Sequence, residues 1–274
     1  MSVRRPDLPT DAGRRPPPMI PGVYNYCDRW CERCPLTARC EVFRDQARDE
    51  AAMTATLAAP HAFLDQPFDQ DDEVPVPPEV AAASAELVSG LDEATRSETA
   101  EESERLTAAW RRHRQRVRAH PIPTAAREYA ALAQGVLQAV SRLVEGRPGT
   151  DETARLAVET LRWHAPLIAV RSVRAAAGLV PDDPVGDGDD GRGNGPDEVQ
   201  SDANGTAKLV RLLIGESIDA WRALSQPGRG VANGVPLAMI DRLDRLDRQV
   251  ADAFPKAMAF VRPGFDDGEP PGAA

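Results

Sequence analysis

The chain has 274 residues, 42% of them hydrophobic, and a formal net charge of -10 at pH 7. This length suffices for one large domain or two small ones. The negative charge excludes a nucleic-acid or anionic-membrane surface spread over the whole protein, so nucleic acid is not an expected partner. No run of 18 apolar residues occurs, and we expect no membrane-spanning helix. The absence of an apolar signal near Met1 makes a cytoplasmic location the default expectation.

The N-terminal third of the chain is predicted to have little regular structure. Residues 1–20 are rich in arginine and proline, which predicts a disordered arm. Residues 21–59 hold every cysteine, and we expect a metal-binding loop followed by a short helix that begins near Cys40. Residues 60–78 contain five prolines and an acidic run, which is typical of a linker.

The remainder, residues 79–265, is predicted to be helical, because no stretch shows the sustained polar–apolar alternation of a strand. We expect a mobile loop over the Asp/Gly-rich residues 181–205. The predicted fold is therefore all-α, a helical bundle of about five helices with an N-terminal four-cysteine metal loop. The expected helices cover 79–118, a helix capped by Thr124 that ends at 145, 150–177, and a helix capped by Asp202 or Asn204 that ends at Leu224. A last helix is expected from 236, interrupted by Pro255 and closed by residues 262–264.

All four cysteines lie within fourteen residues, in the pattern Cys27-x3-Cys31-x2-Cys34-Pro35-x4-Cys40. Cysteines that served only as small apolar residues would be scattered through the core. In a reducing compartment, clustered thiols stay free to bind a metal and are not expected to pair as disulfides. The pattern predicts one metal site with four possible sulfur ligands.

The spacing of the cysteines bears on which metal they bind. Structural zinc normally takes two Cys-x2-4-Cys pairs separated by a dozen or more residues, whereas the longest gap here is five residues. A [4Fe–4S] cluster is larger than an ion, and a single wrapping loop can reach its four corners. The spacing favours a [4Fe–4S] cluster, and zinc remains the alternative.

The stretch from Cys31 to Cys40, with Pro35 after Cys34, resembles the Cys-x2-Cys-Pro-x4-Cys part of two known [4Fe–4S] loops. One belongs to the helix–hairpin–helix DNA glycosylases and the other to the WhiB-like redox regulators. The resemblance covers about fourteen residues and implies that Cys31, Cys34 and Cys40 are three cluster ligands and Cys27 the fourth. No hairpin motif accompanies the loop, so the resemblance does not extend to DNA repair.

Outside the loop, His164 is the main candidate for a second site, because Pro166 interrupts its helix and frees a backbone carbonyl nearby. Glu159 and Glu216 are its candidate partners, while a core histidine with satisfied hydrogen bonds is the simpler interpretation.

Three functions are compatible with these features. The first is a non-enzymatic protein whose cluster is redox-sensing or structural, attached to a bundle that binds a protein partner. The second is an iron–sulfur oxidoreductase or electron-transfer enzyme with a pocket near His164. The third is a zinc-stabilised scaffold without a redox role. The sequence favours the first.

Overall fold

The computed structural model describes residues 17–47, 93–145, 152–181, 196–226 and 234–266, with isolated helical positions between 78 and 85. Over these residues the fold is all-α and contains no strand, which confirms the predicted class. None of the helices described is long and apolar enough to cross a membrane. The long helices are α3 (Glu93–Ala119), α4 (Pro121–Glu145), α5 (Glu152–Ala177), α6 (Asp202–Leu224) and α7 (Gly234–Ala253).

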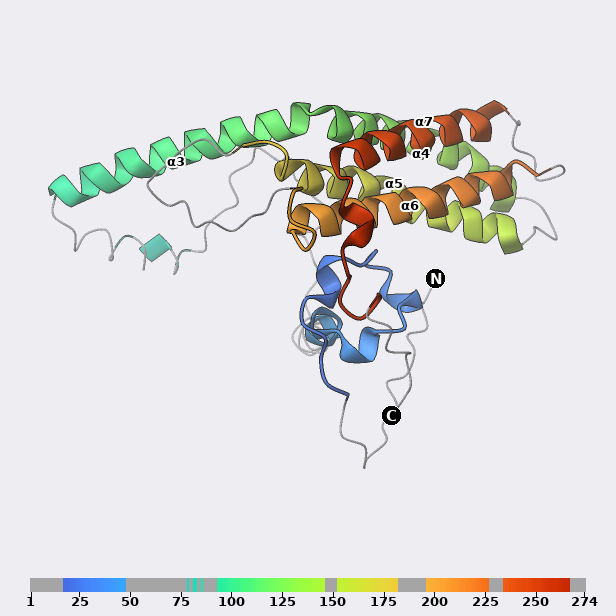
Figure 1. Ribbon diagram of the computed structural model, residues 1–274, viewed down its shortest axis with the longest axis horizontal. Coiled ribbons are helices and arrows are strands. Elements are labelled where there is room, and N and C mark those ends of the chain that lie inside the picture. The colour runs from blue at the N-terminus through green and yellow to red at the C-terminus, as the bar shows by residue number, and fades with distance from the viewer. Residues whose placement is uncertain are drawn as a thin grey trace. The chain divides into compact units, whose positions relative to one another are not determined.

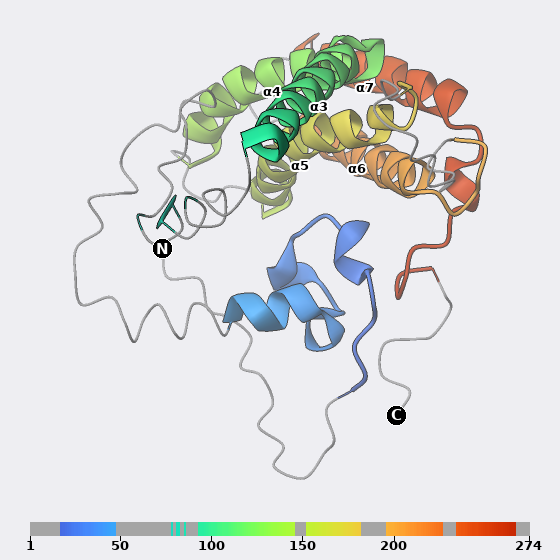
Figure 2. The same cartoon turned by 90° about the vertical axis from the view of Figure 1, so that its left-hand side faces the viewer.

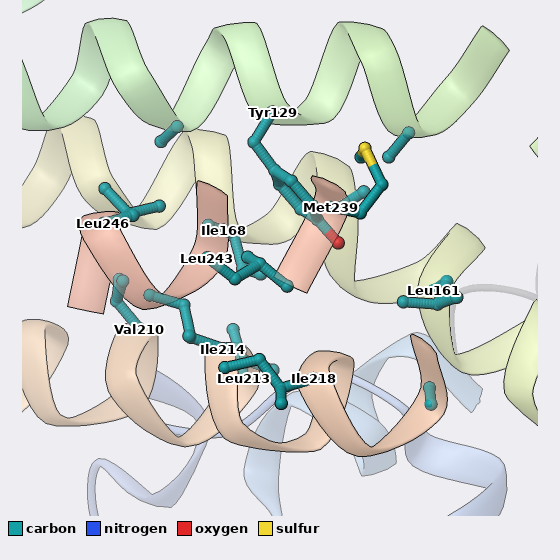
Figure 3. Packing of buried hydrophobic residues seen from close by; sticks show 14 of the residues in the cluster. Tyr129, Leu161, Ile168, Val210, Leu213, Ile214, Ile218, Met239, Leu243 and Leu246 are labelled. Atoms are coloured by element: carbon teal, nitrogen blue, oxygen red, sulfur yellow. The ribbon is translucent and has the colours of Figure 1, made fainter. Parts of the chain in front are cut away.

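Helices α4 to α7 form a four-helix bundle in which each helix packs against two neighbours, in the cyclic order α4, α5, α6, α7. Successive helices run in opposite directions (Figure 1), the up-down-up-down arrangement of simple bundles. Each helix contributes large buried side chains to one core, and Figure 3 shows them meeting between the ribbons. Among them, Trp221 Nε1 donates a hydrogen bond to the hydroxyl of Tyr129 at 3.1 Å, so both buried polar tips are paired.

The chain divides into two compact units. The first joins Met1–Arg44 with His113–Asp182 and Asp189–Ala274, and therefore contains both the cysteine loop and the bundle. The second consists of Asp45–Arg112 and Asp183–Gly188. The boundary predicted at 59 lies outside the described residues, as does the predicted linker over 60–78 except for residue 78. Of the predicted arm, only residues 17–20 are described.

Helix α4 begins at Pro121, so Thr124, the predicted N-cap, lies inside the helix. The side chain of His120 caps it, because Nδ1 accepts a hydrogen bond from the backbone N–H of Ile122 at 3.3 Å. Pro121 and Pro123 occupy the first turn, where a missing N–H costs no helical hydrogen bond. They end α3 as expected, but they also start the next helix.

The loop predicted over 181–205 is wrong at its C-terminal end, because α6 begins at Asp202. Ser201 is the N-cap, and its side chain accepts a hydrogen bond from the backbone N–H of Asn204 at 3.2 Å. The cap is therefore one residue before the earlier of the two predicted candidates. Residues 182–195 of the predicted loop lie outside the described part of the chain. The predicted ends of α5 and α6 are confirmed.

Candidate functional site

The cysteine segment folds as three short 3-10 turns, and Cys34 and Cys40 directly follow the second and third. Their backbone N–H groups close these turns on the carbonyls of Cys31 and Thr37. Both cysteines have extended backbone, and Pro35 favours that conformation at Cys34 because a residue before proline avoids the helical region. The turns are η1 (Val23–Asn25), η2 (Cys31–Arg33) and η3 (Thr37–Arg39).

All four cysteines line a single cavity and are free thiols. The space between the side chains is about 20 Å³, enough for one water-sized body. Among the residues that the structure describes, no three His, Cys, Asp or Glu side chains are arranged as ligands around one ion. The four sulfurs thus share a cavity without forming a closed cage for a single ion.

Burial and mutual repulsion oppose ionisation of these thiols. Burial, together with the charges of the neighbouring Cys27, Cys34 and Cys40, raises the pKa of Cys31 to about 11. Burial also raises the pKa of Cys27 and of Cys34. In the opposite direction, the backbone N–H of Leu36 donates to Cys34 Sγ at 3.4 Å and favours the thiolate. A cation bound in this cavity would displace thiol protons, so metal binding is expected to depend on pH.

Arg171 of α5 is a positive charge near the cavity that the sequence analysis missed. Its side chain is largely buried and donates to the carbonyl of Cys27 at 3.4 Å. Together with Arg29 it acts to lower the pKa of Cys27 against the larger effect of burial. No local pattern marks Arg171 as a site residue, because it reaches the loop only through tertiary packing.

The backbone of the loop is strained between its first two cysteines. Arg29 has a φ of 58°, which places a non-glycine residue in the left-handed region. Such a conformation costs about 1–2 kcal/mol and persists only where the surroundings impose it. The neighbouring Asp28 and Trp30 supply that restraint, since a carboxylate oxygen of Asp28 accepts from the Trp30 backbone N–H at 3.0 Å.

Trp30 connects the cysteine cavity to the bundle. It lines the cavity and is 8% exposed. Its ring stacks on Trp163 of α5 at a centroid distance of 5.5 Å and meets the ring of His164 edge-on at 6.2 Å. Trp163 Nε1 also donates to the carbonyl of Asp28 at 2.8 Å. The loop is thereby fixed to α5 beside Cys31.

Arg33 makes a second contact with α5. Its guanidinium lies over the ring of Trp30, 3.6 Å from the centroid, and pairs with Glu159 at 2.6 Å. Both charged side chains are partly exposed, so the ion pair alone contributes little, about 0–1 kcal/mol. Its main effect is to keep Trp30 covered.

Tyr26 fixes the loop to α6 and to the segment after α7, which runs beside the loop in Figures 1 and 2. Its hydroxyl donates to Asp202 at 3.1 Å, and its ring lies 4.6 Å from that of Phe260. Burial raises the pKa of Tyr26 to about 12. Gly205 makes room for this packing, because a Cβ there would lie 2.5 Å from the Tyr26 ring and 2.6 Å from that of Phe260.

The loop has only a small apolar core of its own. Ile20, Val23 and Leu36 are buried together, with Phe265 packed against them. Gly264, at a φ of 75°, allows the close approach of Ile20. Three buried apolar side chains bury little area, so this part of the chain depends on the bundle, on a metal, or on both for its stability.

His164 is 1% exposed beneath Trp30. Burial lowers its pKa, which favours the neutral ring. Neither ring nitrogen makes a hydrogen bond of normal geometry, although a backbone group of Leu213 interacts with the ring and acts to raise its pKa. Of the two predicted partners, Glu216 lies 3.5 Å from Nε2, while Glu159 pairs with Arg33.

Comparison of the chain with protein-family models, with curated proteins and with solved structures gave no match in any of the three. The candidate site therefore rests on its own geometry and chemistry.

Proposed function

We propose that this chain is a non-enzymatic iron–sulfur protein that holds a [4Fe–4S] cluster on Cys27, Cys31, Cys34 and Cys40 and senses redox state through it. One observation carries the proposal: four thiols share one cavity, and Trp30 in the wall of that cavity packs directly on α5. When bound, the cluster would supply reversible one-electron chemistry and sensitivity to oxidants.

The arrangement supports a cluster better than zinc. A zinc ion bonds sulfur at about 2.3 Å and needs four tetrahedral ligands close together. The sulfurs of the described loop share one cavity. They are delivered by one continuous run of turns, which suits a body with four separate corners. Aromatic and aliphatic side chains around the cavity would limit access of water to the cluster.

The contacts of the loop supply a way to transmit the state of the cluster. The loop's own core is small, so loss of the cluster is expected to loosen it. Trp30 would then leave the face of α5 and uncover Trp163 and His164. A protein partner of the bundle would then bind the newly exposed aromatic surface.

The enzyme alternative has less support. A catalytic histidine must touch its substrate, and His164 is sealed beneath Trp30 with 1% of its surface exposed.

The test compares two variants prepared without oxygen, Cys34→Ala and Glu32→Gln. Glu32 lies in the same turn of the loop and is no candidate ligand, so it is a matched control. After reconstitution with iron and sulfide, the wild type and Glu32→Gln should show broad visible charge-transfer absorption, and Cys34→Ala should not. Hydrogen–deuterium exchange should be fast over residues 17–44 of Cys34→Ala and slow in the other two.

Air oxidation of the reconstituted wild type tests the sensing role separately. Bleaching should be accompanied by faster exchange in residues 17–44. Bleaching without a change in hydrogen–deuterium exchange would show that oxidation of the cluster does not alter the contacts of the loop. The sensing proposal would then fail.

A further inference from the structure

A hollow of about 530 Å³ lies between α4 and α5 and shares no lining residue with the cysteine cavity. Alanine side chains of both helices form part of its wall. The α4 wall includes Ala130, Ala131 and Gln134, and the α5 wall consists of Arg162, Ala165 and Pro166.

The wall of the hollow is mostly apolar and carries one positive charge. Alanine, leucine and proline side chains form most of it, and the amides of Gln134 and Gln138 add polar groups. Among the residues that the structure describes, Arg162 is the single formally charged one in the lining, and no acidic residue lines the hollow. This is notable in a chain with a net charge of -10. Apolar walls with a few polar groups and a volume of about 300–1,000 Å³ are typical of small-molecule sites.

We propose that the hollow binds a small amphipathic carboxylate. The apolar body of the ligand lies against Ala130, Ala131 and Ala165, and its carboxylate meets the Arg162 guanidinium, which is suited to bidentate pairing with carboxylates. The proposal stands on this hollow alone and does not depend on the cluster.

The dimensions favour a small molecule over a docked helix. On α5 the lining spans only Arg162 to Pro166, which is four steps along the helix, or about 6 Å at 1.5 Å per residue. A helix held in a groove uses anchors at i and i+7, about 10 Å apart, and needs walls of that length on both sides.

The test uses full-length protein, sodium octanoate as the probe and neutral octanamide as the matched ligand, with binding followed by amide chemical shifts. Octanoate should bind saturably and shift α4 and α5 resonances, and octanamide should bind at least about fivefold more weakly.

Ala131→Phe fills the hollow and should weaken octanoate binding at least about tenfold, whereas Ala139→Phe, at an exposed α4 position outside the lining, should not. Arg162→Gln should remove the preference for octanoate over octanamide, and Arg155→Gln, on an exposed position of α5, should keep it.

Three results would overturn the proposal: no saturable octanoate binding, equal binding of octanoate and octanamide by the wild type, or unchanged binding by Ala131→Phe. Sedimentation of the wild type and of Ala131→Phe covers a further possibility. A dimer that Ala131→Phe converts to a monomer would show that a second copy of the chain covers the hollow, and the small-ligand proposal would be wrong.

Discussion

Trp30 of the cysteine loop stacks on Trp163 of α5, with ring centroids 5.5 Å apart and 25° between the ring planes. The two residues are 133 positions apart in the sequence, yet the first borders the cysteine cavity and the second is 39% exposed on the bundle. The stack thus connects the wall of the cysteine cavity to an exposed aromatic side chain of the bundle.

Removing this connection should both destabilise the protein and uncover a histidine. Trp30→Ala deletes a buried indole, and we expect a loss of about 3 kcal/mol in the free energy of unfolding measured with urea. His164 should also become open to diethyl pyrocarbonate, detected by mass spectrometry. Trp110→Ala, at a tryptophan that is 57% exposed, is the control and should leave His164 protected. If His164 stays protected in Trp30→Ala, Trp30 is not its cover.

Two glycines of α6 provide a matched pair for testing how the loop docks. Gly205→Ala places a Cβ within 2.6 Å of both Tyr26 and Phe260, and the clash should cost about 1–3 kcal/mol. Gly215→Ala meets nothing within 4 Å and should stabilise the helix by up to about 1 kcal/mol. Thermal or urea unfolding measures both. Equal effects of the same sign would mean that Tyr26 does not pack over Gly205.

Arg171 should tune the reduction potential of a bound cluster. A unit charge about 10 Å away at an effective dielectric constant of about 20 contributes roughly 1.7 kcal/mol, or about 70 mV for one electron. Reduction adds negative charge, so Arg171→Met should lower the potential by tens of millivolts. Arg155→Met, on an exposed position of the same helix, is the control. A potential that is unchanged or raised in Arg171→Met, measured by redox titration, would contradict the assigned role.

Asp266, in the segment after α7, should make the free energy of unfolding depend on pH in the acid range. Burial alone would raise the pKa of Asp266, but hydrogen bonds from Arg262 and Lys208 outweigh it and hold the pKa well below the ordinary value of 3.8. Because the folded-state pKa is depressed, this stabilisation is complete above pH 3.8 and is lost as the pH falls through the folded value.

We therefore expect the wild type to be more stable than Asp266→Asn at pH 6, and the difference to narrow at pH 3. Urea unfolding at the two pH values gives the comparison. A difference that stays constant or widens in acid would show that Asp266 is not held ionised by these partners.

The helices were largely predictable because their signals are local. The apolar face of α5 and the glycine after Ala177 fix its end, and Leu224 closes an apolar periodicity in α6. The N-caps of α4 and α6 were misplaced by one to four residues. His120 is not a usual cap residue, and Ser201 stands beside two other good caps.

The candidate site was predictable only in part. The short spacing of the four cysteines predicts that they lie together, as they do around one cavity. Pro35 predicts the extended backbone at Cys34. The groups that hold and tune the loop were not foreseen, because they come from distant positions: Arg171 meets Cys27 across 144 positions of sequence. Such long-range contacts leave no periodicity or spacing in the sequence from which they could be predicted.

Metal and acid-labile sulfide analysis of protein purified without oxygen tests the central claim most directly. The account predicts about four irons and four sulfides per chain and no stoichiometric zinc. One zinc per chain without iron, neither metal, or cysteines joined to one another as disulfides would contradict it.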